Sequence, residues 1–129
     1  IAMHLKKGWM ISRASEAGDL KGFCLTGIKA RGSDLTKLSL ENADLGKADL
    51  EEADLSGCNL SGAQFVSTNL KFANLEGANL QGADLEGANL FEADLTEANL
   101  EGLSLERTNL ESAKFLKTIM PDGHLHTRQ

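Results

Sequence analysis

Residues 73–100 decide the fold, and they read ANLEG ANLQG ADLEG ANLFE ADLTE ANL. Every fifth residue in this stretch is leucine, and alanine stands two positions before each leucine. A helix has about 3.6 residues per turn, so leucines five apart would rotate by about 140° each time and could not share one face. A long strand would alternate with a period of two. The pattern therefore predicts a chain that makes a short straight run, turns, and repeats.

The same register extends in both directions, from residue 18 to residue 122, without an insertion or a deletion. These 105 residues form 21 units of five. Leucine occupies the central position of each unit, with these exceptions: Ala30, Phe65, Phe115 and Met120. Because every turn has the same length, this part of the chain lacks the longer loops that carry active sites in many enzymes.

Composition supports a repetitive core and narrows the class of protein. A length of 129 residues fits one domain, and five Phe, one Trp and no Tyr leave Leu and Ala to build the core. The net charge of −6 and the pI near 5.0 disfavour general binding to nucleic acids or anionic membranes. No apolar run approaches the roughly 18 residues of a membrane span. We expect a cytoplasmic location by default, and a lumenal or periplasmic one if a leader has been removed.

Strand alternation fixes the direction of the side chains within each unit. Leucine and the alanine two positions before it point inward, and the Asp or Asn between them points outward, where it can bond to the backbone of the turn. On this register Cys58 occupies an inward position and Cys24 an outward one. The spacing predicts no disulfide between them.

Units such as ADLEE, ADLSG, ANLEG and ANLQG follow the pattern A-(D/N)-L-x-x, which resembles the pentapeptide-repeat family over about four fifths of the chain. The ending TIMPDG is similar to the close of many cyanobacterial members. The resemblance implies an all-β solenoid, a right-handed quadrilateral β-helix with one unit per side and four units per coil. Residues 20 apart would then stack roughly 4.8 Å apart, and residues 18–122 would make about five coils.

The N-terminal end departs from the pattern. Residues 1–17 lie outside the register and are expected to cap the rod. Leu5 and Trp9 are spaced as on one helical face, which favours a helical cap, but Gly8 weakens this reading, and residues 9–11 fit an extended segment equally well. Larger residues replace the inward alanine in the first coils, so we expect a wider first coil on which Leu5 and Trp9 pack. These residues are Phe23, Ile28 and Leu38. Ala30 replaces a central leucine next to Ile28, which replaces an inward alanine, so the two exchanges together roughly conserve the side-chain volume in the core.

The C-terminal end stops the register with the turn signal Pro121-Asp122-Gly123. Residues 123–129 are predicted to be a flexible tail. Just before the turn, four apolar residues crowd together and form a candidate end-to-end contact between two copies: Phe115, Leu116, Ile119 and Met120.

The last position of each unit is the third residue of its turn, where a type II turn requires positive φ and therefore favours Gly or Asn. Read at intervals of 20, one column of these positions contains only such residues: Gly22, Asn42, Gly62, Gly82 and Gly102. The other three columns are mixed. The sequence therefore predicts type II turns along one corner of the solenoid.

Catalytic and metal-binding patterns are missing from the sequence. The three histidines, His4, His124 and His126, lie in the termini, and His124 with His126 is better explained as a solvated tail than as a metal site. There is no glycine-rich phosphate loop. The many acids recur with the repeat and are expected to be solvated. The sequence predicts no enzyme, no cofactor and no metal.

Charge is segregated along the chain. Residues 1–41 contain seven Lys/Arg and four Asp/Glu (net +3), residues 42–106 two and thirteen (net −11), and residues 107–129 four and two (net +2). This pattern favours solubility and suppression of edge stacking. It also leaves an acidic surface for a basic partner as a second interpretation.

Two outward phenylalanines, Phe72 and Phe91, fall on the same face of adjacent coils in the four-sided register. They form a candidate interaction patch with four neighbours: Val66, Lys71, Glu52 and Glu92. The alternative is that the two rings merely cover each other at a corner.

These features predict a non-enzymatic, rigid interaction or scaffold module whose protein partner is unknown, because leucines fill the interior and leave recognition to the surface. The alternative is an acidic, DNA-mimicking inhibitor of a DNA gyrase or topoisomerase, a role known in some family members. A weak homodimer through the C-terminal end is a third possibility. Direct nucleic-acid binding is not expected.

Overall fold

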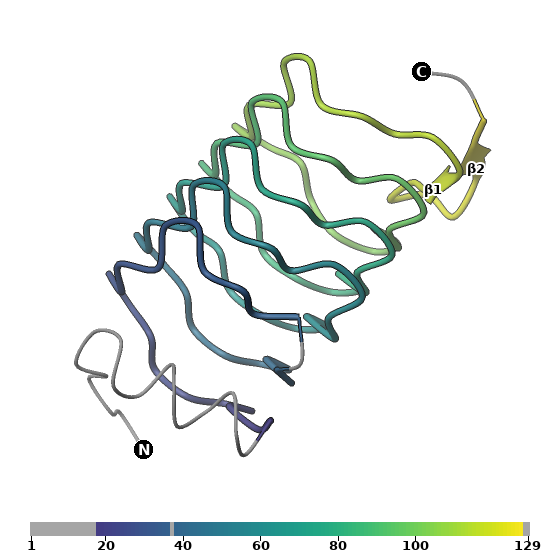
Figure 1. The fold of residues 1–129 in the computed structure, drawn as a ribbon. Coiled ribbons are helices and arrows are strands. Elements are labelled where there is room, and N and C mark those ends of the chain that lie inside the picture. The colour runs from purple at the N-terminus through teal and green to yellow at the C-terminus, as the bar shows by residue number, and fades with distance from the viewer. Residues whose placement is uncertain (1–17, 37, 128–129) are drawn as a thin grey trace.

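The computed structural model describes residues 18–36 and 38–127. The chain winds into stacked coils that form a rod, with the N-terminal coils at one end and the C-terminal coils at the other (Figure 1). Isolated parallel bridges connect the coils, from Asp19 with Ser39 up to Asn99 with Ile119, and each joins residues 20 apart. Four units of five residues therefore complete one circuit, which gives the rod four walls.

The walls consist of single bridges because each straight run is only a few residues long before the chain turns. Backbone hydrogen bonds between coils hold them in register: the Leu50 N–H donates to the Asn69 carbonyl (2.8 Å), and the Asp44 N–H donates to the Phe23 carbonyl (2.9 Å). Longer strands occur only near the C-terminus within the described residues. They are β1 (Thr118–Ile119) and β2 (Leu125–His126), which pair antiparallel.

The interior is formed by the central leucines and the inward alanines, as the sequence predicts. Leu60, Leu80 and Ala63 have no exposed surface, and Phe65 is fully buried at a leucine position. Ile28 and Ala30 are both buried in the first coils, as expected if the smaller Ala30 compensates for the larger Ile28. The predicted packing of Leu5 and Trp9, and the predicted helical cap, lie outside the described residues.

The outward Asp and Asn residues bond to the turns, as expected. The Asp44 Oδ1 atom accepts a hydrogen bond from the Gly46 N–H (2.9 Å), and the Asn74 Oδ1 atom accepts one from the Glu76 N–H (3.0 Å). Such bonds use a backbone donor that the turn leaves free. This explains why the residue before each leucine is so often Asp or Asn.

Positive φ is found at all five positions of the predicted corner, from Gly22 (69°) to Gly102 (79°). The turns there close through a hydrogen bond such as that from the Phe23 N–H to the Leu20 carbonyl (3.1 Å), so the prediction of type II turns along this corner is confirmed. The mixed corners nevertheless adopt the same conformation, with Lys47 at 58° and Phe72 at 60°. Residue type alone did not reveal this, because bonds to the next coil hold every corner alike.

The C-terminal segment folds back on the last coil. Ile119 pairs with Leu125, and the turn between them closes through a hydrogen bond from the Gly123 N–H to the Met120 carbonyl (2.8 Å). The Phe115 and His126 rings also contact edge to face, with their centroids 6.0 Å apart. Residues 123–129 were predicted to be a flexible tail, whereas Leu125 and His126 are paired with the body of the rod. Residues 128–129 lie outside the description.

The two cysteines point as predicted and are both free. Cys58 is buried, its Sγ atom donates to the Leu35 carbonyl (3.0 Å), and burial raises the pKa of its thiol to about 11. Cys24 is partly exposed, and the hydrogen bond with the Thr26 hydroxyl lowers its pKa.

This difference predicts selective thiol chemistry. At about pH 8, the folded protein is expected to react rapidly with one equivalent of DTNB, at Cys24, because the thiolate is the nucleophile and Cys58 is neither exposed nor ionised. The second equivalent should react only after unfolding in guanidinium. A Cys24→Ser variant that still reacts rapidly while folded would contradict this.

Candidate interaction surface

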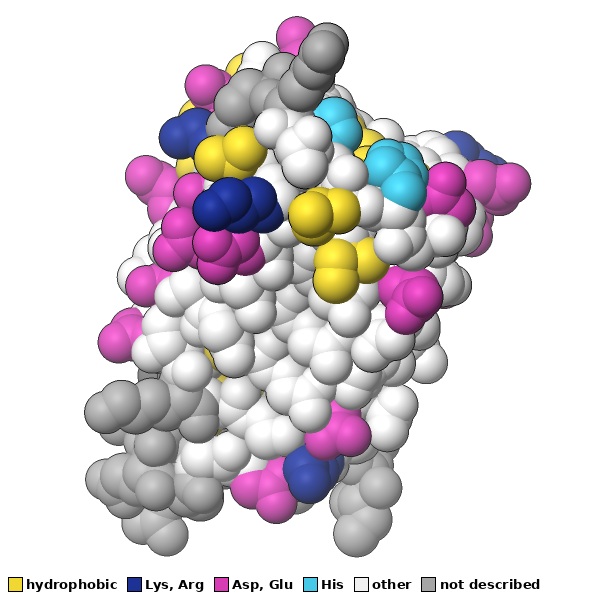
Figure 2. Space-filling view, turned by 90° about the vertical axis from the view of Figure 1, so that its right-hand side faces the viewer, with side chains coloured by type: hydrophobic (Ala, Val, Ile, Leu, Met, Phe, Trp, Pro, Cys, Tyr) yellow, Lys and Arg dark blue, Asp and Glu magenta, His cyan; other side chains and the backbone are white. Residues whose placement is uncertain are grey.

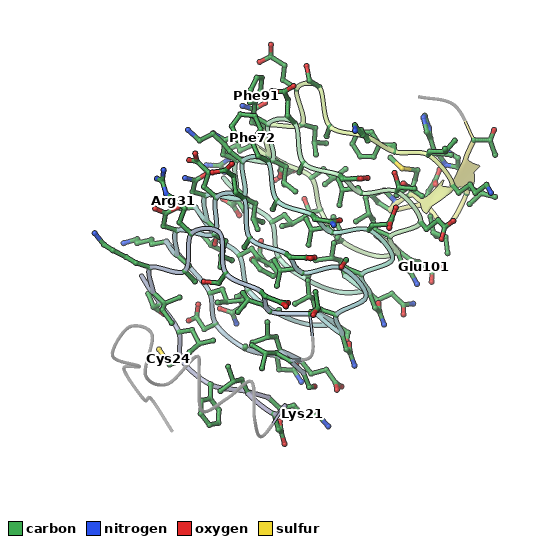
Figure 3. All side chains as sticks on the ribbon, viewed as in Figure 1. Lys21, Cys24, Arg31, Phe72, Phe91 and Glu101 are labelled. Carbon is green, nitrogen blue, oxygen red and sulfur yellow. The ribbon has the colours of Figure 1, made fainter. Side chains whose placement is uncertain are left out.

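The two outward phenylalanines are brought into contact at one corner of the rod, which we call the third corner. It comprises the turns that directly follow Leu50, Leu70 and Leu90, which are residues 51–52, 71–72 and 91–92. The ring centroids of Phe72 and Phe91 are 5.7 Å apart, and their planes meet at 83°. The Phe72 N–H donates to the Phe91 carbonyl (2.9 Å). Figure 3 shows both rings on the edge of the rod that also carries Arg31.

The ring contact leaves much of the pair in solvent. Phe91 is half-buried, but Phe72 keeps 44 % of its surface exposed. Val66 is also exposed, at 37 %. It lies in the turn that begins the wall centred on Leu70, whereas Phe72 lies in the turn that ends it, so Val66 stands at the opposite edge of the wall.

Charged side chains stack below the aromatic pair at intervals of 20 residues. Glu51 forms ion pairs with Arg31 (3.5 Å) and with Lys71 (3.6 Å), and the Asn69 amide donates to it (3.1 Å). This ladder of Arg31, Glu51 and Lys71 was missed by sequence reasoning, although alternating charges at a spacing of 20 would have revealed it. Lys71, which the sequence predicts to lie beside the two phenylalanines, is therefore already paired with Glu51.

Arg31 also neutralises a carboxylate on the wall. Its Nη2 and Nε atoms donate to the Asp49 Oδ2 atom (3.1 and 3.3 Å). Partial burial acts to raise the pKa of Asp49, but the Glu51 N–H and the Arg31 guanidinium outweigh it and lower the pKa. Exposed pairs of this kind stabilise a fold only slightly, so their main effect is to set the charge of the corner.

Glu52 and Glu92 lie directly below and above Phe72 in the stack, at the last positions of their units. Both are exposed. Within residues 18–36 and 38–127, neither forms an ion pair. The exposed aromatic ring therefore stands between two carboxylates that form no ion pair with the described residues.

The candidate end-to-end contact looks different from the sequence-based expectation. Phe115, Leu116, Ile119 and Met120 are each only partly exposed, because β2 covers part of this end. Among residues 18–36 and 38–127, the most exposed large apolar side chain is Leu125 of β2, at 54 %. Figure 2 looks onto the side that carries β1 and β2 and shows apolar and histidine side chains gathered toward this end, above a largely uncharged wall.

Metal sites and membrane spans can be assessed for the described part of the chain. Among residues 18–36 and 38–127, no three His, Cys, Asp or Glu side chains are placed to hold a metal ion. His124 is bonded to Asp122 through its Nδ1 atom, and His126 packs against Phe115. The same residues include no helix with the length and apolar character that a bilayer crossing requires.

The four-walled rod and its repeat place the chain among the β-helical solenoids, and comparison with known proteins defines the family. The family model described as pentapeptide repeats matches residues 19–51, 48–87, 68–102 and 88–122. The chain therefore belongs to the pentapeptide-repeat family, whose members fold as right-handed β-helices. No curated protein matches the chain.

Solved structures of the same family resemble this one. A pentapeptide repeat protein from the Arabidopsis thaliana thylakoid lumen is 25% identical with a TM-score of 0.57, over 84% of this chain and 74% of that one. Rfr23 from the cyanobacterium Cyanothece 51142 is 31% identical with a TM-score of 0.49, over 85% and 96%. HetL from the cyanobacterium Nostoc, involved in regulating heterocyst differentiation, is 30% identical with a TM-score of 0.41, over 84% and 62%. This chain thus spans less than two thirds of HetL.

Proposed function

We propose that this chain is a non-enzymatic interaction or scaffold module that binds a protein partner at the third corner. The observation that carries the proposal is the exposure of Phe72 on a rod whose leucines fill its interior. Exposed aromatic side chains next to a second apolar ring are typical of protein-binding surfaces. In the proposed layout, residues 18–122 form a β-helix of about five coils, and residues 1–17 cap its first coil.

The proposal predicts a partner that depends on both rings. With the chain as bait in an extract of its native host, replacing Phe72 and Phe91 by Ser should abolish capture of that partner. The purified partner should then bind the wild type at least about 10-fold more tightly than the double variant, a difference of about 1.4 kcal/mol. Circular dichroism should show an unchanged fold, since both side chains point outward.

Leu125→Ser is the matched control, because it removes an apolar side chain at the C-terminal end that is at least as exposed as Phe72. It should leave capture unchanged. Equal loss of binding in both variants, or undiminished binding by the double Phe variant, would contradict a role for the third corner. Loss in the control alone would favour the end-to-end contact, which light scattering at high concentration would show as a dimer.

The DNA-mimicking inhibitor is supported by the excess of acids in residues 42–106. Their placement counts against it, because the acids are spread over all four walls and are interrupted by neutral Asn and by the cations Lys47 and Lys71, while Arg107 from the following segment pairs with Glu86. A supercoiling assay with DNA gyrase distinguishes the two functions. Inhibition at micromolar protein would favour mimicry over the interaction module.

A further inference from the structure

The residues around Phe72 adopt a backbone conformation that their side chains disfavour. Glu52, Phe72 and Glu92 have φ values of 62°, 60° and 54°. The left-handed region is unfavourable for an L-residue other than glycine, and glycine occupies four of the five positions in the column of Gly22, Asn42, Gly62, Gly82 and Gly102. Positive φ recurs at all four corners and does not single out this one, but neither the core nor the turn explains an exposed phenylalanine at such a position.

The corner presents a specific combination of chemistry. Phe91 holds the Phe72 ring edge to face, so the ring that remains exposed is fixed in orientation. Glu52 and Glu92 are one coil below and one coil above it, roughly 5 Å away along the rod axis. The nearby cation Lys71 is paired with Glu51 instead.

We propose that this corner binds an arginine-containing segment of the partner protein, an inference that rests on the proposed function. A guanidinium group stacks on the face of an aromatic ring and at the same time donates paired hydrogen bonds to a carboxylate. Over Phe72 it lies within reach of Glu52 or Glu92. An acidic segment would be repelled, and a purely apolar segment would bury both carboxylates without a partner.

The test uses two synthetic peptides, acetyl-GRGRG-amide and the same peptide with citrulline, a neutral isostere, in place of each arginine. Backbone amide shifts of the isotope-labelled protein report binding at each residue. The arginine peptide is expected to shift the amides of Glu52, Phe72 and Glu92 and to bind at least about fivefold more tightly than the citrulline peptide, from a cation–π contact and an added ion pair. The preference should fall as salt is added.

Variants test which residues cause the preference for the arginine peptide. Phe72→Ser and the double variant E52Q/E92Q should each remove the preference for arginine. Glu97→Gln is the matched control, because Glu97 is exposed and has a φ of 60° at the last position of a unit on another corner. It should leave the preference unchanged.

Equal binding of the two peptides, or equal loss in E97Q and E52Q/E92Q, would overturn the inference. If the peptides fail but the F72S/F91S variant still loses its native partner, the third corner is an interaction surface for a partner without arginine. If both experiments fail, the proposed function fails as well.

Discussion

Replacing Phe65 by Ala is expected to lower the free energy of unfolding by about 3–5 kcal/mol. Phe65 is fully buried and takes the place of leucine in a stack between Leu45 and Leu85. Closed walls on four sides leave the surrounding backbone little freedom to collapse into the cavity, so the loss should fall near the upper end of this range. Chemical denaturation, followed by circular dichroism, measures the change.

Phe65→Leu is the matched control for this prediction. It restores the residue found above and below in the same stack, and it should cost only about 1 kcal/mol because most of the volume is kept. A similar loss in both variants would mean that the packing of the ring, and not the filling of the stack, stabilises this level of the rod.

Deleting Gly77 alone is expected to abolish the cooperative unfolding transition. Gly77 has a φ of 69° and closes one corner: its N–H donates to the Thr96 carbonyl (2.8 Å), and the next N–H, of Ala78, donates to the Leu75 carbonyl (3.0 Å). A chain shortened by one residue cannot keep both bonds and the inward direction of the following leucine, since side chains alternate with a period of two. Thermal unfolding followed by circular dichroism and calorimetry would show the change.

Deleting residues 78–97 is the control for that experiment, although it removes 20 residues. It joins Gly77 to Ala98, and Asn99 and Leu100 then take the places of Asn79 and Leu80 in the same stack. The shortened rod should still unfold cooperatively, with a lower midpoint because it has one coil fewer. Cooperative unfolding of the Gly77 deletion, or its loss in the longer deletion, would contradict a fold held by the stacking of residues 20 apart.

Much of the third corner could be predicted from the sequence. Counting in fives places Phe72 at the end of the unit centred on Leu70, and Phe91 in the unit centred on Leu90. The two rings are in contact, as that count suggests. The count works because every turn has the same length, so vertical neighbours follow from arithmetic. The same count places Glu51 between Arg31 and Lys71, but it could not show that Arg31 also pairs with Asp49, 18 residues away (3.1 Å).

By itself, the sequence determined the solenoid: which residues face inward, which stack on one another, and that Cys58 is buried while Cys24 is not. The reason is that an unbroken five-residue period with small and large apolar positions fits only one way of burying its leucines. The tertiary structure alone decided the backbone conformation of the mixed corners and the pairing of the C-terminal segment with the last coil. Phe72 takes positive φ against its own preference because its N–H is fixed to the Phe91 carbonyl of the next coil, and β2 folds back because its backbone completes the hydrogen bonds of β1. Bonds between coils, which no local pattern encodes, thus set the shape of the surface proposed to bind a partner.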